Sequence, residues 1–110
     1  LENLDRYVAD KRETAARYAE FFKGKEDITF FTEPADCKSN YWLNAVVLKD
    51  KAAQLDFLEY TNDHGVMTRP VWELMNRLPM FEHCETDGLE NTEWLADRVV
   101  NIPSSVRLDK

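Results

Sequence analysis

The segment YWLNAVVLKDKAAQLDFLEYTNDHGVMTRP, residues 41–70, decides the fold because it contains two strands separated by a helix. Its first eight residues, Tyr41–Leu48, are apolar at both alternating sets of positions except at Asn44. Strands buried on both faces have this composition, so we expect a strand at the centre of the sheet, covered on two sides. Lys51–Asp63 then carries apolar residues at helical spacing, which predicts a helix.

The other expected elements extend outward from this segment. Residues 1–23 carry apolar side chains at three-to-four spacing, which predicts a long amphipathic helix that ends at Gly24. This pattern begins at Leu1 with no capping residue before it, which favours a fragment of a longer chain. The remaining expected elements are an edge strand over 28–32, a strand over 66–69 that Pro70 confines to an edge or a bend, a helical turn over 71–78, a helix from a cap at Asn91 or Thr92 to Arg98, a strand over 99–102, and a helix that could begin at Ser104.

This alternation of strands and helices predicts an α/β (α+β) two-layer sandwich. Helices would pack on a small mixed or antiparallel sheet of three or four strands. The sequence has no internal repeat and no linker, so we expect residues 1–110 to form a single domain. Surface scaling gives roughly 6,300 Å² folded against about 18,700 Å² unfolded, so about two-thirds of the surface can be buried.

Composition and charge exclude several classes of protein. The chain is 44% hydrophobic, with three Trp, four Tyr and six Phe, which excludes a disordered tail. It has 21 acidic and 14 basic residues and a net charge of −7, which argues against a nucleic-acid partner. No apolar run reaches the length of a membrane span, and the charged first residues exclude a signal peptide. We therefore expect a cytoplasmic protein with no membrane partner.

The groups that titrate near neutrality do not form a recognisable reactive cluster. They are Cys37, His64, His83 and Cys84. No pair has metal-ligand spacing, so we expect no zinc site, and two thiols without a secretory signal favour reduced cysteines. His83 and Cys84 are sequence neighbours in a polar loop and would point apart, which argues against a nucleophilic dyad.

The segment GVMTRPVWELMNRLPMF, residues 65–81, is the strongest candidate for a binding site. It places Arg69 at a strand end and Trp72 three residues later, followed by Met75, Met80 and Phe81. A guanidinium binds a carboxylate or phosphate bidentately, while an aromatic face covers a ring. The segment therefore suits an anionic or sugar-nucleotide ligand. The alternative is a buried cluster of Trp and Met beside a surface arginine.

Together with SNYWLNAVVL (39–48) and LADRVVNIPSSV (95–106), this segment resembles the C-terminal portion of the DegT/DnrJ/StrS family of pyridoxal-phosphate sugar aminotransferases. The likeness is closest to the LegC-type branch, which acts on nucleotide-linked 4-keto-6-deoxy sugars in surface-glycan pathways. It spans essentially the whole chain. It implies the C-terminal small domain of a fold-type-I aminotransferase, in which a long helix leads out of the large domain and a small α/β layer closes one side of the active site.

The resemblance also implies which parts of the enzyme this chain lacks. The family's Schiff-base lysine and cofactor-binding residues lie upstream in the large domain, so we expect no pyridoxal phosphate in this chain and no transaminase activity from it alone. None of the lysines has the pattern of a desolvated group, which a Schiff-base lysine requires; they are Lys11, Lys23, Lys25, Lys38, Lys49, Lys51 and Lys110.

The candidate substrate contacts come from the same resemblance. Many relatives read G-I-x-T-x-x-H-Y-x-P-x-H here, with the tyrosine and the second histidine near the substrate. Trp72 stands at the tyrosine position, Asn76 at that histidine and Leu74 at the proline. Arg69 and Asn40 are the other polar residues expected near the sugar nucleotide or the amino-donor carboxylate. No residue of this chain is expected to be catalytic.

Two hypotheses about function follow. The first is a piece of a nucleotide-sugar aminotransferase that converts a 4-keto-6-deoxy sugar into a 4-amino sugar, whose partner is the missing large domain. The alternative is a free-standing binding or assembly module that reuses the fold. In both cases an uncovered apolar face that includes Tyr7, Trp72 and Met75 predicts self-association as a homodimer, through the first helix or that face.

Overall fold

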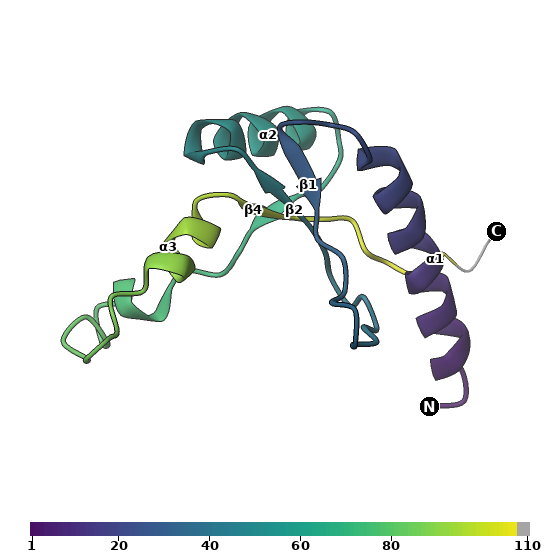
Figure 1. The fold of residues 1–110 in the computed structure, drawn as a ribbon, viewed down its shortest axis with the longest axis horizontal. Coiled ribbons are helices and arrows are strands. Elements are labelled where there is room, and N and C mark those ends of the chain that lie inside the picture. Colours follow the sequence, from purple (N-terminus) through teal and green to yellow (C-terminus); the bar gives the residue numbers. More distant parts are fainter. Residues whose placement is uncertain (108–110) are drawn as a thin grey trace.

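The computed structural model describes residues 1–107, which form an arch (Figure 1). The elements are α1 (Leu4–Phe22), β1 (Ile28–Phe30), β2 (Asn44–Leu48), α2 (Lys51–Asp63), β3 (Arg69–Pro70), the 3-10 helix η1 (Met75–Arg77), α3 (Glu90–Ala96) and β4 (Val99–Ile102). In Figure 1, α1 forms one end of the arch and the excursion that contains α3 forms the other. The sheet and α2 lie between them.

The four strands form one sheet in the order β1-β2-β4-β3, and every neighbouring pair is antiparallel. β2 lies at the centre, where Val46 is opposite Phe30 of β1 on one side and Val100 of β4 on the other. β3 is an edge strand, as Pro70 predicts, because proline has no N–H to donate to a further strand. The α/β two-layer class is confirmed, with a fully antiparallel sheet.

The core lies on one face of this sheet. The buried apolar residues are Ala15, Phe30, Val46, Leu48, Val100 and Ile102. Both long helices pack against this cluster, α1 through residues that include Tyr18 and α2 through residues that include Phe57. Ala45 and Val47 point to the opposite face and are only half-buried. The expectation that the central strand is covered on both sides is therefore wrong. Both helices pack against the same face of the sheet, and the opposite face of β2 is only half-buried.

Aromatic side chains and one hydrogen bond attach α1 to the core. The rings of Tyr18 and Phe22 lie 5.9 and 6.4 Å from the ring of Phe30. The Tyr18 hydroxyl donates to the backbone carbonyl of Pro103 at 2.8 Å, and burial raises the pKa of Tyr18. The helix ends as the sequence predicts, since Gly24 has a φ of 78°, a conformation that favours glycine.

Two predicted strands begin later than expected because local geometry interrupts the extended chain. β2 begins at Asn44 and not at Tyr41, which has a left-handed φ of 46°. β3 covers Arg69–Pro70 and not residues 66–69, because the Val66 N–H is still hydrogen-bonded to the Thr61 carbonyl of α2. The first helix, α1, begins at Leu4 and not at Leu1. The strand expected over 28–32 ends two residues earlier, at Phe30.

The predicted helix starts near the C-terminus are also corrected. α3 follows Leu89, a left-handed residue with a φ of 53°, and neither Asn91 nor Thr92 is its cap. No helix begins at Ser104 within the described residues, because its hydroxyl bonds to the Ile102 carbonyl and the Asn44 N–H and holds the chain extended. The turn expected over 71–78 is the single 3-10 turn η1.

The chain is more open than a compact protein of its mass. Its accessible surface is 8464 Å², whereas a compact monomer of this mass exposes about 6,300 Å². The radius of gyration is 16.0 Å, whereas about 13 Å is expected for a compact chain of this length. Within residues 1–107, no helix combines the length and hydropathy needed to cross a bilayer.

Candidate ligand-binding site

A pocket of about 800 Å³ lies where α1, the segment before β2, β3 and the end of β4 meet. Its lining includes Lys11, Trp42, Arg69, Trp72, Asn101 and Ser104. The described lining contains two cations and no aspartate or glutamate, although the chain as a whole carries a net charge of −7. The pocket is therefore suited to an anionic ligand.

Arg69 reaches this pocket because β3 is fixed on both sides. Arg69 lies opposite Asn101 of β4, so the two residues share one face of the sheet. On the other side, the buried Thr68 hydroxyl bonds to Thr61 at 2.7 Å and accepts from Asn62 at 3.0 Å, which ties the strand to the end of α2.

The Arg69 guanidinium itself is available for a ligand. It donates to the carbonyl of Thr68 at 3.2 Å, and no carboxylate lies within ion-pairing distance among residues 1–107. The side chain is exposed at the pocket. Its remaining donors can therefore form bidentate contacts with a phosphate or a carboxylate.

Trp72 is paired with a second tryptophan that the sequence did not single out. The rings of Trp72 and Trp42 have centroids 6.5 Å apart and planes 29° from parallel. Both side chains are largely exposed, at 71% and 65%. The alternative of a buried Trp and Met cluster is therefore wrong, since Met75 is also 62% exposed.

The turn before β2 sets the position of Trp42. Asn40 accepts a hydrogen bond from the Trp42 N–H at 3.0 Å, and the Ser39 hydroxyl accepts one from the Tyr41 N–H at 2.9 Å. The left-handed Tyr41 lies between them. The motif SNYWL thus forms a turn that carries Trp42 to the pocket, and the side-chain oxygen of Asn40 is used within it.

An ion pair holds the loop that leads to this turn. Arg12 donates to both carboxylate oxygens of Glu33, at 2.7 and 2.9 Å, and to the Ser39 carbonyl at 2.6 Å. Glu33 also accepts from the Ser39 N–H. These hydrogen bonds, the one from Arg12 first, lower the pKa of Glu33 to about 2, while the same contact raises the pKa of Arg12.

Lys11 precedes Arg12 on α1 and contacts the pocket wall directly. Its ammonium donates to the Ser104 carbonyl at 2.6 Å and to the Trp42 carbonyl at 3.3 Å. The Ser104 hydroxyl in turn accepts from the backbone N–H of Asn44 at 2.8 Å. In the sequence, Lys11 does not have the pattern of a desolvated lysine. Its position next to Arg12 does not indicate that both side chains reach the loops.

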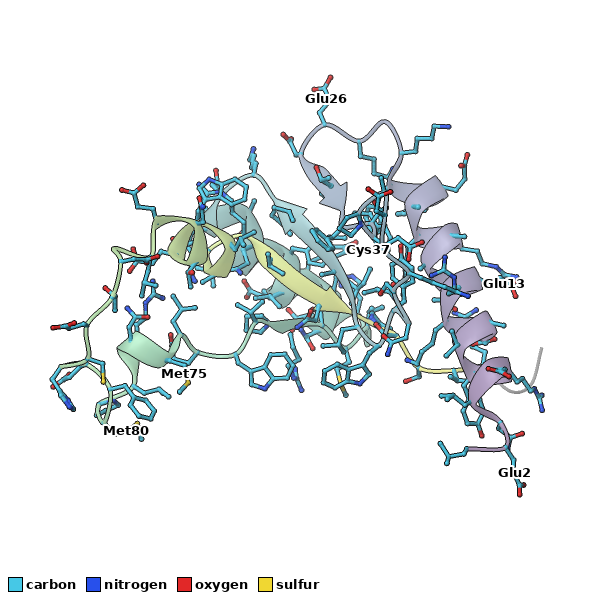
Figure 2. The ribbon with its side chains drawn as sticks, turned by 60° about the horizontal axis from the view of Figure 1, so that its bottom comes forward. Glu2, Glu13, Glu26, Cys37, Met75 and Met80 are labelled. Carbon is cyan, nitrogen blue, oxygen red and sulfur yellow. The ribbon has the colours of Figure 1, made fainter. Side chains whose placement is uncertain are left out.

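Of the four predicted contact residues, the structure brings two together. Arg69 and Trp72 line the pocket, whereas Asn40 lies in the turn beside it. Asn76 lines a separate cavity of about 480 Å³ between η1 and the segment before α3. In Figure 2 this region, marked by Met75 and Met80, lies at the opposite end of the molecule from α1.

The cysteines and histidines do not form a reactive or metal-binding cluster in the described residues. Cys37 and Cys84 are free and exposed. His64 stacks on Tyr60 with centroids 4.1 Å apart at the end of α2. Residues 1–107 contain no group of three or more histidine, cysteine, aspartate or glutamate side chains that could hold a metal ion.

Comparison with known proteins gives one family. A family model described as the DegT/DnrJ/EryC1/StrS aminotransferase family matches residues 1–110. The chain is 27% identical over 108 residues to a Bacillus subtilis protein named as the pyridoxal phosphate-dependent aminotransferase EpsN. That match covers 94% of this chain and 28% of EpsN.

Solved structures have the same fold. The crystal structure of the sugar aminotransferase CalS13 from Micromonospora echinospora matches with a TM-score of 0.79 and 25% identity, over 96% of this chain and 27% of CalS13. The aminotransferase TlmJ from Streptoalloteichus hindustanus matches with a TM-score of 0.86 and 22% identity, over 96% of this chain and 28% of TlmJ. The chain thus spans little more than a quarter of the length of these relatives.

Proposed function

Because this chain belongs to the DegT/DnrJ/EryC1/StrS aminotransferase family, we propose that it is the substrate-side, C-terminal small domain of a pyridoxal-phosphate-dependent nucleotide-sugar aminotransferase. The proposed reaction converts a nucleotide-linked 4-keto-6-deoxy sugar into a 4-amino sugar for a surface glycan, as in the LegC-type branch. The proposed enzyme is a cytoplasmic homodimer. The partial coverage of EpsN supports the proposal that this chain is one part of a larger enzyme, since most of the relative's length lies outside the match.

The observation that carries the proposal is the pocket that combines Arg69 with two exposed tryptophans. Arg69 binds a phosphate or carboxylate of the ligand, and Trp72 covers a ring of it. Trp42 extends the same aromatic surface. Asn40 acts through Trp42, whose backbone N–H it binds. Asn76 lies in a different cavity and is left out of the proposed contact set.

Pyridoxal phosphate would supply the electron sink for amino transfer, but the residues of this pocket do not fit it. The one lysine in the lining, Lys11, is held by two backbone carbonyls. The described lining also has no carboxylate to pair with the cofactor's ring nitrogen. We therefore propose that the cofactor belongs to the remainder of the enzyme and that this chain alone has no transaminase activity.

The test is a pair of titrations on the 110-residue chain. Calorimetry with a nucleotide-linked amino sugar should give binding that Arg69→Ala weakens by about tenfold or more, because a charge-assisted hydrogen bond is lost. Arg77→Ala is the matched control. Arg77 is an arginine of η1 that does not line the pocket and contacts Glu73 at 3.8 Å.

The second titration uses pyridoxal phosphate and absorbance spectroscopy. We expect no visible band of lysine-bound cofactor. A genuine band would contradict the proposed division between this chain and the rest of the enzyme. Sugar binding that Arg69→Ala leaves unchanged would contradict the proposed site, and a stable chain that binds no nucleotide sugar would favour the assembly module.

A further inference from the structure

Within residues 1–107, the pocket lining contains two cations, Arg69 and Lys11. The proposed function assigns a ligand contact to Arg69 but none to Lys11. Arg69 lies opposite Asn101 of β4, and the Lys11 ammonium contacts the carbonyl of Ser104, three residues further along the same segment. Three residues of extended chain span at most about 11 Å. α1 and β3, which are far apart in the sequence, therefore bring two cationic side chains to one pocket.

The charge of Lys11 is held in place but not neutralised. Its two contacts, to Ser104 at 2.6 Å and Trp42 at 3.3 Å, are with neutral carbonyls. An ammonium has three donors, so one remains for a ligand. Among residues 1–107 no carboxylate lies within ion-pairing distance of Lys11 or of Arg69. An anion in the pocket would relieve the repulsion between the two cations.

The same lysine contacts the segment that carries one of the two indoles. Its ammonium bonds to the backbone of Trp42, whose ring lies 6.5 Å from that of Trp72. The pocket thus offers an aromatic surface next to two cations. A ligand that matches both parts has a planar ring joined to a group with two negative charges.

We propose that Lys11 and Arg69 together bind the diphosphate of a nucleoside diphosphate whose base stacks on Trp42 and Trp72. Lys11 is then a ligand-binding residue that selects for the doubly charged group, in addition to joining α1 to the pocket wall. This inference rests on the proposed function, since it assigns the nucleotide part of the substrate to this pocket.

The test measures binding of uridine diphosphate, inorganic diphosphate and uridine to the 110-residue chain by calorimetry and tryptophan fluorescence. Lys11→Met should weaken binding of both diphosphates by about tenfold, because a charged contact is lost. It should leave uridine binding unchanged. Lys11→Arg should retain diphosphate affinity. Lys49→Met, which removes an exposed lysine outside the pocket, controls for the loss of one positive charge.

The probes separate a ligand contact from a purely structural one. If Lys11 only fixed the pocket wall, Lys11→Met would weaken uridine and uridine diphosphate equally, which would overturn the inference. Circular dichroism checks the fold, and Lys11→Gln, which keeps amide donors without the charge, repeats the test if Lys11→Met unfolds. If Arg69→Ala abolishes binding while Lys11→Met and Lys11→Gln leave it unchanged, the role of Lys11 is overturned and the proposed function stands. Absence of uridine diphosphate binding by the wild type would overturn both.

Discussion

Glu33 shows how one side chain can fix a long loop. Its carboxylate accepts from Arg12 of α1 and from the Ser39 N–H at the far end of the loop. Its own backbone N–H donates to the Tyr41 hydroxyl at 3.0 Å. The segment between β1 and β2 is thus closed on itself and on α1, and this closure places the turn that carries Trp42.

The Glu33 contacts predict a pH dependence. The pKa of this carboxyl falls from 4.5 to about 2 in the folded chain. Ionised Glu33 therefore stabilises the fold fully above the unfolded pKa, and this contribution is lost as the pH falls from about 4.5 towards 2. Glu33→Gln should flatten the fall of the thermal unfolding midpoint in this range. Glu26→Gln, at an exposed position, should keep the wild-type profile. Identical profiles for wild type and Glu33→Gln would refute the assignment.

Arg69 and Trp72 could be found from the sequence, whereas Lys11 and Trp42 could not. A strand-end arginine followed by an exposed aromatic residue is a local pattern, and both residues do line the pocket. The apolar pattern of residues 41–48 predicts that Trp42 lies in a buried strand, whereas β2 begins at Asn44, after the left-handed Tyr41. Lys11 depends on where α1 lies relative to Ser104, a tertiary contact across 93 positions of sequence.

At the scale of elements, Gln54 joins α2 to the turn between α3 and β4. Its side chain is fully buried, and its amide nitrogen donates to the carbonyls of Ala96 and Val99, both at 2.9 Å. Its side-chain oxygen has no partner within the described residues. A single polar side chain therefore binds one carbonyl on each side of this turn.

Gln54→Met should destabilise the fold by about 1–3 kcal/mol. Two partly buried carbonyls lose their donor, while removal of the unpartnered oxygen offsets part of that cost. Urea unfolding measures the change. Leu55→Met, at the neighbouring exposed position, should stay within about 0.5 kcal/mol of wild type. A Gln54→Met variant as stable as Leu55→Met would show that the two hydrogen bonds contribute nothing.

The elements that the sequence predicts best are those with local end signals. α2 has the expected bounds because Asp50 caps it by accepting from the Ala53 N–H at 2.8 Å and Gly65 follows it with a φ of 78°. α3 is different, since Leu89 adopts a left-handed conformation that no sequence rule assigns to leucine. Its start depends on the surrounding loop and not on a capping side chain.

At the scale of the whole molecule, the exposed surface predicts self-association. The chain exposes 8464 Å², about 2,000 Å² more than a compact monomer of its mass. The excess includes the large apolar side chains Trp42, Met67, Trp72 and Met75. Because such surface is usually covered, we expect a symmetric dimer at high concentration.

Sedimentation velocity tests this expectation. The double variant Trp72→Ser and Met75→Ser should shift the dimer towards monomer. Tyr60→Ser, which removes an equally exposed aromatic side chain from α2, should not. A wild-type chain that remains monomeric at high concentration would contradict the prediction.

The fold class could be predicted from the sequence, but the open shape could not. The mass of the chain predicts that about two-thirds of its surface is buried. The same apolar residue types can serve a core or an uncovered face, so composition does not distinguish them. Trp72 and Met75 contribute to the hydrophobic content as buried residues would, yet both lie at the surface.

Lys11 and Arg12 are neighbours on α1 but hold different segments. Lys11 holds the carbonyls of Trp42 and Ser104, and Arg12 holds Glu33 and the Ser39 carbonyl. Of these segments, those of Trp42 and Ser104 line the pocket. A displacement of α1 must therefore move these two walls with it or break the Lys11 contacts. The position of the first helix is thus coupled to the width of the pocket.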